Sequence, residues 1–397
     1  MNIGIVTTWF PAGAGYVSKA YRDVLEKEHK VLIYARGGKI MKGDTLWDDE
    51  KITWAPVYAN GINTKHLLKW AKINKIDILF FNEQRYWKPV FAAKKSGICI
   101  GCYIDYYTQL SVKAFGIYDF LVCNTQRHYK VFNWHPQCFY IPWGTNIERF
   151  KPKYEQKSKK LTFIMNLGWG GTYDVDRKGF LLAIDAFKKV RGDCKLLIYS
   201  QVELTKCLDI WKESVENDKR IDFISGTFDP FPYPNGDVYV YPSRLDGIGL
   251  SLPEALSCGL PAITTDCAPM NEFVQSEING QLVKVEKYLG RNDGYYWAES
   301  ICNVDSLSEA MQMYLNDENL VYEQKRNARS NAEKSLNWVN NSKDLSNIFS
   351  NSIKNKNIYN DDLNQYAKLW LDQLTSPSLK YRFMKLVRDF IKNLIKL

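Results

Sequence analysis

The chain has 397 residues, of which 45% are hydrophobic and 14% aromatic, and its sequence holds no apolar run long enough to span a bilayer. This length exceeds one typical core and suits two α/β domains. The net charge of +9 would suit nucleic acid or anionic lipid. In residues 377–397, however, six basic residues accompany a single acidic one. A nucleic-acid surface is disfavoured, because this charge lies in one terminal helix without an aromatic stacking sheet.

The first half of the chain alternates predicted strands and helices. The N-terminal run Met1–Val6 is typical of a strand and not of a signal peptide. Nine cysteines, an odd number, favour reduced thiols and a cytoplasmic location. Strands are predicted at 3–7, 31–34, 76–81, 98–104, 118–123 and 138–141, and helices at 18–27 and 64–74. This alternation predicts a parallel sheet in residues 1–152, as in a Rossmann-like domain.

A second alternation begins after the hydrophilic linker at 153–160. Strands are predicted at 161–167, 195–199, 221–224 and 238–241, and a helix at 180–190. Residues 158–335 are therefore expected to form a second Rossmann-like domain. An amphipathic segment at 335–350 predicts one further helix, within residues 336–355.

Residues 356–397 are predicted to form a helical tail. At 100° per residue, large apolar side chains of 383–395 fall on one arc, and the cations fall on the other. This pattern is typical of a helix that lies on anionic lipid. The first interpretation is peripheral binding at the inner face of the membrane through 377–397. The alternative is a helix that docks on the protein itself or on a partner.

The most informative stretch is 238–266, which predicts a strand, a glycine-spaced loop, a helix that begins near Pro253, and a second strand. Asp246 and Glu254 stand eight positions apart across the loop. Backbone N–H groups of Gly249 and Leu250, near the helix start, would favour a phosphate. Carboxylates accept hydrogen bonds from sugar hydroxyls. The arrangement therefore suits a ligand with hydroxyls at two ends and a phosphate between them.

This stretch resembles the E-x7-E region of the family 4 retaining glycosyltransferases, with Asp246 in the first acidic place. The resemblance implies a GT-B fold of two facing Rossmann-like domains, with a final helix that crosses back to the first. It implies transfer of a hexose, with retention, from a UDP- or GDP-linked donor to a glycan or lipid-linked acceptor, as in polysaccharide biosynthesis. By this resemblance Glu254 would accept from the ribose, and Asp246 from a sugar hydroxyl.

A second motif, residues 170–179, follows the first strand of the second domain. It resembles the phosphate-binding region of family 4 enzymes, especially phosphatidylinositol mannosyltransferases, in which an arginine precedes the lysine by six positions. The resemblance implies that Lys178 neutralises the donor diphosphate. Thr172 occupies the arginine's place, so Arg177 is a candidate replacement for that arginine. Its absence from position 172 leaves open that the catalytic activity is weaker. The alternative is a solvated Arg-Lys pair at the start of a helix.

Two features of the first domain complete the candidate site. The loop Trp9–Tyr16 resembles the family loop that approaches the donor phosphate, with Gly15 as the candidate residue; a plain glycine turn is the alternative. The segment 101–107 lies where many members read His-Asp. Here Ile104 takes the His place, which leaves Asp105 as a contact to the transferred sugar or as a cap of the next turn.

The sequence favours catalysis without a metal ion and without any cofactor besides the donor. Asp174 and Asp176 match the D-x-D pattern of metal-dependent transferases, but their neighbours fit the phosphate motif, so exposed loop acids are expected. Two other interpretations stay open. One is a catalytically silent relative that only binds a sugar nucleotide, as Thr172 and Ile104 allow; the other is a sugar-nucleotide epimerase of GT-B fold.

Overall fold

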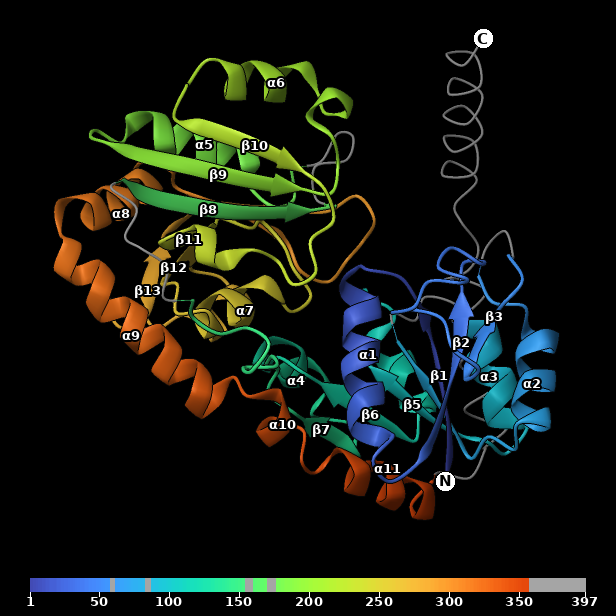
Figure 1. Cartoon of the computed structure of the whole chain (residues 1–397). Helices are drawn as coiled ribbons and strands as arrows, with labels where there is room; N and C mark the ends of the chain where they lie inside the picture. Colours follow the sequence, from blue (N-terminus) through green and yellow to red (C-terminus); the bar gives the residue numbers. More distant parts are fainter. Residues whose placement is uncertain (58–60, 83–86, 154–159, 170–175, 357–397) are drawn as a thin grey trace, which may run out of the picture.

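The fold is built on two parallel β-sheets, one from each half of the chain, with helices packed on them (Figure 1). The computed structural model describes residues 1–57, 61–82, 87–153, 160–169 and 176–356. The predicted tail at 356–397 therefore lies outside the described residues, apart from Lys356.

The first sheet has the strand order β3-β2-β1-β4-β5-β6-β7, and every neighbouring pair is parallel. The order reverses between β1 and β4, which marks the point where ligands bind in doubly wound sheets. The strands are β1 (Asn2–Thr8), β2 (Lys30–Arg36), β3 (Ile52–Trp54), β4 (Ile78–Phe81), β5 (Cys99–Tyr103), β6 (Phe120–Cys123) and β7 (Cys138–Tyr140). The helices are α1 (Gly13–Leu25), α2 (Thr64–Ile73), α3 (Trp87–Lys95) and α4 (Gln126–Phe132).

The second sheet repeats this plan with the order β10-β9-β8-β11-β12-β13, and its reversal lies between β8 and β11. Its strands are β8 (Leu161–Gly168), β9 (Cys194–Ser200), β10 (Ile221–Ser225), β11 (Val238–Tyr241), β12 (Ala262–Thr265) and β13 (Gly280–Val283). Its helices are α5 (Phe180–Lys189), α6 (Asp209–Glu216), α7 (Ser251–Ser257), α8 (Val304–Asn316) and α9 (Glu318–Ser335). The GT-B arrangement of two facing Rossmann-like domains is confirmed.

The end of the described chain crosses from the second domain to the first, as Figure 1 shows for α9, α10 and α11. The single helix expected at 335–350 is two helices, α10 (Trp338–Asn341) and α11 (Leu345–Lys354). The break lies at Ser342, whose hydroxyl donates to the carbonyl oxygen of Trp338 at 2.5 Å. Ser and Asn side chains compete with the helical backbone in this way, and the apolar periodicity alone does not reveal it.

Aromatic packing attaches this crossing segment to the first sheet. The Trp338 ring lies 4.6 Å from Trp143 and 5.6 Å from Tyr21, measured between ring centroids. Phe349 is fully buried against Phe80. The two domains therefore share one continuous apolar core through this segment.

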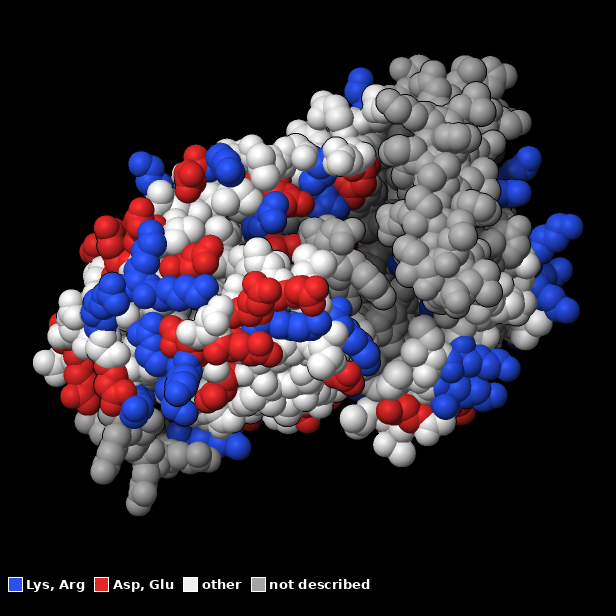
Figure 2. Space-filling view, turned by 90° about the horizontal axis from the view of Figure 1, so that it is seen from above, with Lys and Arg blue, Asp and Glu red and all other residues white. Residues whose placement is uncertain are grey.

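The surface over β9, β10 and α6 carries charges of both signs, and Figure 2 shows basic and acidic side chains side by side on this lobe. Several are ion pairs, among them Lys195–Asp222 and Lys212–Asp209. Within the described ranges, every helix is too short or too polar to cross a membrane.

Candidate active site between the two domains

A cavity of about 490 Å³ lies between the two sheets, at the carboxyl ends of their strands. Thr8 ends β1 at one wall, and Gly168 ends β8 at the other. Seven of the eight residues that the sequence predicted for the site line this cavity; they are Asp105, Arg177, Lys178, Asp246, Gly249, Leu250 and Glu254. The fold thus brings together side chains from both halves of the chain.

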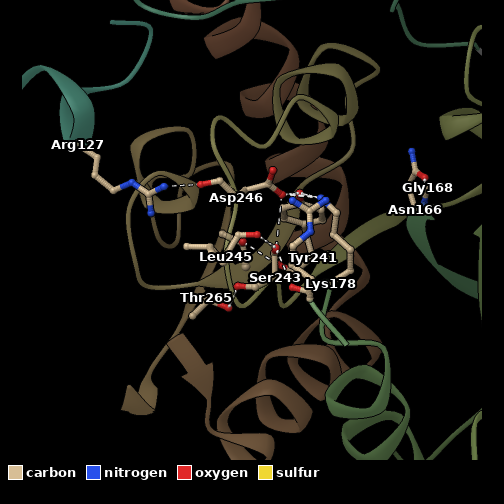
Figure 3. A network of polar contacts seen from close by, with 11 residues as sticks. Arg127, Asn166, Gly168, Lys178, Tyr241, Ser243, Leu245, Asp246 and Thr265 are labelled. Atoms are coloured by element: carbon tan, nitrogen blue, oxygen red, sulfur yellow. Dashed lines mark hydrogen bonds and ion pairs between the residues drawn. The ribbon is translucent and has the colours of Figure 1, made fainter. Parts of the chain in front are cut away.

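The buried centre of the second domain's wall is a pair formed by Lys178 and Asp246. The Lys178 ammonium donates to Asp246 Oδ2 at 2.5 Å, and each side chain is only 13% exposed. The Tyr241 hydroxyl donates to the same carboxylate and accepts from Lys178. Figure 3 shows these three side chains converging, with the backbone carbonyl of Asp246 turned to Arg127. The sequence analysis assigned Lys178 and Asp246 to separate parts of the nucleotide sugar, whereas in the structure the two side chains are paired with each other.

This pairing fixes the charges of both groups. Burial alone would raise the pKa of Asp246, but the charges of Lys178 and Arg177 and the hydrogen bonds from Lys178 and Tyr241 hold it well below its usual range. Burial lowers the pKa of Lys178, an effect that Asp246 opposes and Arg177 increases. Asp246 is therefore anionic at neutral pH, beside two cations that line the same cavity.

The second predicted acid, Glu254, lies on α7 in a different environment. It accepts a hydrogen bond from the Tyr233 hydroxyl at 2.7 Å. Burial raises the pKa of Glu254 to about 7, and this hydrogen bond partly offsets the rise. Glu254 lines the main cavity and also a second cavity of about 150 Å³, which Tyr199, Phe228 and Phe231 border.

The glycine loop shapes the wall between the two acids. Gly249 adopts φ of +86°, a conformation that side chains disfavour, and Leu250 follows it at the start of α7. A Cβ on Gly247 would lie 2.0 Å from Asp105 Oδ1 of the first domain. The absence of a side chain at Gly247 therefore lets Asp105 approach the loop that carries Asp246.

Gly15 is the one predicted residue that does not line the cavity. It lies inside α1, where a Cβ would meet the carbonyl oxygen of Phe10 at 2.1 Å. Its role is close packing of the helix on the preceding loop. Gly13 and Tyr16 of the same helix line the cavity instead. Helix α1 begins five residues before the predicted helix and includes Gly15, so the approach of Gly15 to a phosphate stays a prediction.

Residues 148–335 match the family described as glycosyl transferases group 1. This match covers the second domain, which is less than half of the chain. No curated protein matches the chain.

Solved structures extend the likeness to both domains. Sucrose-phosphate synthase from Thermosynechococcus elongatus aligns with a TM-score of 0.70 at 15% identity, over 88% of this chain and 98% of that one. HepE from Anabaena, in complex with UDP and glucose, aligns with a TM-score of 0.67 at 14% identity, over 88% of this chain and 100% of that one. The pneumococcal O-GlcNAc transferase GtfA, in complex with UDP and GlcNAc, aligns with a TM-score of 0.65 at 14% identity, over 89% of this chain and 98% of that one. At these identities the likeness shows the fold alone.

The structure adds residues to the candidate site that the sequence analysis did not single out. Arg127 of α4 donates to the carbonyl oxygens of Asp246 and Ala268 in the second domain. The neighbouring His128 is hydrogen-bonded through Nε2 to the carbonyl oxygen of Gly247 at 3.1 Å. Burial holds the pKa of His128 well below its usual range. These contacts join residues that are 119 to 141 positions apart in the sequence, so local patterns carried no signal for them.

The phosphate motif is only partly described. Residues 170–175, including Thr172 and Asp174, lie outside the described residues. Asp176 is not the exposed loop acid that was expected. Its carboxylate accepts from the backbone N–H groups of Phe180 at 2.6 Å and Leu181 at 2.9 Å, so it caps the N-terminus of α5. This cap places Arg177 and Lys178 at the start of the helix, facing the cavity.

Proposed function

We propose that the chain transfers a hexose from a UDP- or GDP-linked donor to a glycan or lipid-linked acceptor, with retention and without a metal ion. The observation that carries this proposal is one cavity, between the carboxyl ends of two parallel sheets, that Arg177, Lys178, Asp246 and Glu254 line together. HepE and GtfA are solved in complex with UDP, which favours UDP as the nucleotide.

The two cations suit the diphosphate of the donor. Negative charge develops on this leaving group as the glycosidic bond breaks, and fixed positive charge in a buried site stabilises it. Lys178 is held in place by Asp246 and Tyr241, so its ammonium is positioned before the donor arrives. Arg177 supplies the second charge, and the backbone N–H groups near Gly249 and Leu250 would face the phosphates.

Glu254 suits the ribose, because its carboxyl lies where the two cavities meet. A ribose hydroxyl there would donate to the carboxylate, and the base would extend into the smaller cavity. The aromatic faces of Tyr199, Phe228 and Phe231 border that cavity and suit a planar base.

The transferred sugar would then lie between Asp246 and Asp105. The bond from its anomeric carbon to the diphosphate oxygen breaks, and a bond to the acceptor oxygen forms on the same face. The acceptor proton passes to the departing diphosphate oxygen, so the step requires no protein base. Asp246, anionic and fixed by Lys178, would orient the sugar and favour positive charge at the anomeric carbon.

We also propose that residues 377–397 dock on an anionic membrane from the cytoplasmic side. The support is the sequence pattern of cations on one arc and large apolar residues on the other. Such docking would bring the cavity to lipid-linked acceptors of polysaccharide biosynthesis.

The proposal is tested with a panel of UDP-, GDP- and ADP-sugars. Hydrolysis of each donor is measured for the wild type, for Glu254→Ala and for the control Glu216→Ala, which changes an exposed carboxylate at the end of α6. We expect turnover of one nucleotide class, a loss of at least about tenfold in Glu254→Ala, and no change in the control. Donor binding without turnover would establish the silent relative instead, and epimerised donor would establish the epimerase.

A further inference from the structure

The second domain carries a β-hairpin that is separate from its main sheet. Strands β14 (Val285–Leu289) and β15 (Glu299–Cys302) are antiparallel and pair only with each other. Arg244 holds the start of β15, next to the hairpin's tip, through an ion pair with Glu299 at 2.6 Å. The tip, residues 290–298, holds three consecutive aromatic residues, Tyr295, Tyr296 and Trp297.

The tip reaches the first domain after β5. The Tyr296 N–H donates to the carbonyl oxygen of Tyr107 at 2.9 Å, and Trp297 Nε1 donates to the Tyr107 hydroxyl at 2.6 Å. The Tyr295 hydroxyl donates to the carbonyl oxygen of Asp105 at 3.1 Å. Backbone and side-chain contacts together therefore fix the tip against residues 105–108.

One part of the tip faces the main cavity. Tyr295 and Arg291 of the hairpin line it, together with Tyr106 and Asp105 of the first domain. The Tyr295 and Tyr106 rings are stacked, with centroids 5.2 Å apart and planes 13° from parallel. These two half-buried rings, stacked on each other, form an aromatic platform at the cavity wall. The Asp105 carboxylate lines the cavity beside it, and the Arg291 guanidinium lies over the Tyr295 ring, 5.7 Å from its centroid.

The platform lies near the proposed position of the transferred sugar. Asp105 approaches Gly247, the residue after Asp246, so the platform and the Lys178–Asp246 pair border the same region. Burial raises the pKa of Tyr295, and the negative charges of Asp105 and Asp246 raise it further, which agrees with this closeness. An acceptor must place its hydroxyl beside the anomeric carbon, and the platform is a surface at that place.

We propose that the hairpin tip forms the acceptor subsite, in which a hexose ring of the acceptor packs against the Tyr295–Tyr106 stack while its hydroxyls meet Arg291 and Asp105. The C–H face of a sugar ring packs well on an aromatic face, and charged groups at the edge satisfy its hydroxyls. Arg291 is itself held by Asp293 and Glu299, so its charge is compensated and a neutral sugar suits it better than an anionic one. This subsite rests on the proposed function, because it assigns that reaction's second substrate.

The test compares Tyr295→Ala, Tyr295→Phe and the control Tyr288→Ala, which changes a tyrosine of β14 that is 61% exposed. Acceptors are a panel of p-nitrophenyl hexosides, used with the donor that the wild type hydrolyses. We expect Tyr295→Ala to raise the acceptor KM about tenfold while the donor KM and the rate of donor hydrolysis stay at wild-type values. Tyr295→Phe keeps the ring and is expected to stay within about twofold, as is the control.

The outcomes separate this subsite from the proposed function. An unchanged acceptor KM in Tyr295→Ala, with donor hydrolysis intact, overturns the subsite alone. No donor turnover by the wild type overturns the proposed function and the subsite with it. Equal losses of donor hydrolysis and acceptor transfer in Tyr295→Ala would indicate a structural role of the tip and would also overturn the subsite. Thermal unfolding of each variant shows whether the fold is intact.

Discussion

At the scale of single residues, the Lys178–Asp246 pair contributes both to the stability of the fold and to the proposed donor site. Asp246→Asn keeps the shape but leaves a buried ammonium without its counter-charge. Both side chains are 13% exposed, so we expect the free energy of unfolding to fall by about 3 kcal/mol in urea titrations at pH 7. The control is Asp222→Asn, which breaks an exposed ion pair and is expected to cost under about 1 kcal/mol. Equal effects of the two substitutions would contradict the buried pair.

The same pair predicts how stability depends on pH. The folded-state pKa of Asp246 lies below its unfolded value, so its contribution is complete above pH about 4 and declines as the pH falls further. The difference in the free energy of unfolding between the wild type and Asp246→Asn should therefore decrease as the pH is lowered from 5 to 2. A difference that stays constant over this range would argue against an ionised Asp246.

The pKa of Glu254 is shifted in the opposite direction from that of Asp246, and it predicts how donor binding depends on pH. Because burial raises its pKa to about 7, the carboxyl becomes protonated below neutrality and loses acceptor capacity for a ribose hydroxyl. We expect the Kd for UDP-glucose to rise about tenfold between pH 8 and pH 6, and to be independent of pH in Glu254→Gln. Calorimetry with UDP-glucose is suitable, since free UDP has a phosphate that titrates near pH 6. The same pH profile in Glu254→Gln would assign the titration to another group.

At the scale of elements, the two sheets and most of their strands could be predicted from apolar runs, but the connections to the facing domain could not. The β-branched and apolar residues of Leu161–Leu167 predict a strand, and this segment lies in strand β8 of the structure. The hairpin tip at 290–298 has no such period, and its partners stand about 190 positions earlier in the chain. Arg127 likewise occupies an ordinary helix, and its role depends on where Asp246 lies in space.

The C-terminal tail gives a prediction at the same scale. Five cations on the polar arc, near an anionic surface, contribute about 1 kcal/mol each, in addition to insertion of the apolar face. We expect the full-length chain to sediment with liposomes that contain phosphatidylserine, and residues 1–376 to stay in the supernatant. Neutral phosphatidylcholine liposomes and high salt are the controls, because both remove the electrostatic attraction. Equal sedimentation of the two proteins would contradict membrane docking.

At the scale of the whole molecule, three groups of contacts stand out among those of the described residues that hold the domains face to face around the cavity. The first is the crossing segment at 336–354, the second is Arg127 with Asp246, and the third is the hairpin tip. The resemblance to GT-B enzymes predicts the first contact only. The other two depend on side chains that touch only when both domains have folded, which is why sequence patterns do not contain them.

The crossing contact can be tested at Gly144. A Cβ there would lie 2.5 Å from the carbonyl oxygen of Leu336, a backbone atom that cannot rotate away. It would separate Thr145 from Leu336, whose N–H···O contact is 2.7 Å, and from Trp338. We expect Gly144→Ala to lower the free energy of unfolding by about 2 kcal/mol and to change the small-angle scattering profile as the domains shift. Gly290→Ala is the control, since a Cβ at Gly290 meets no atom within 4 Å. If both variants scatter as the wild type does, the orientation of the domains depends on Arg127 and the hairpin rather than on the crossing.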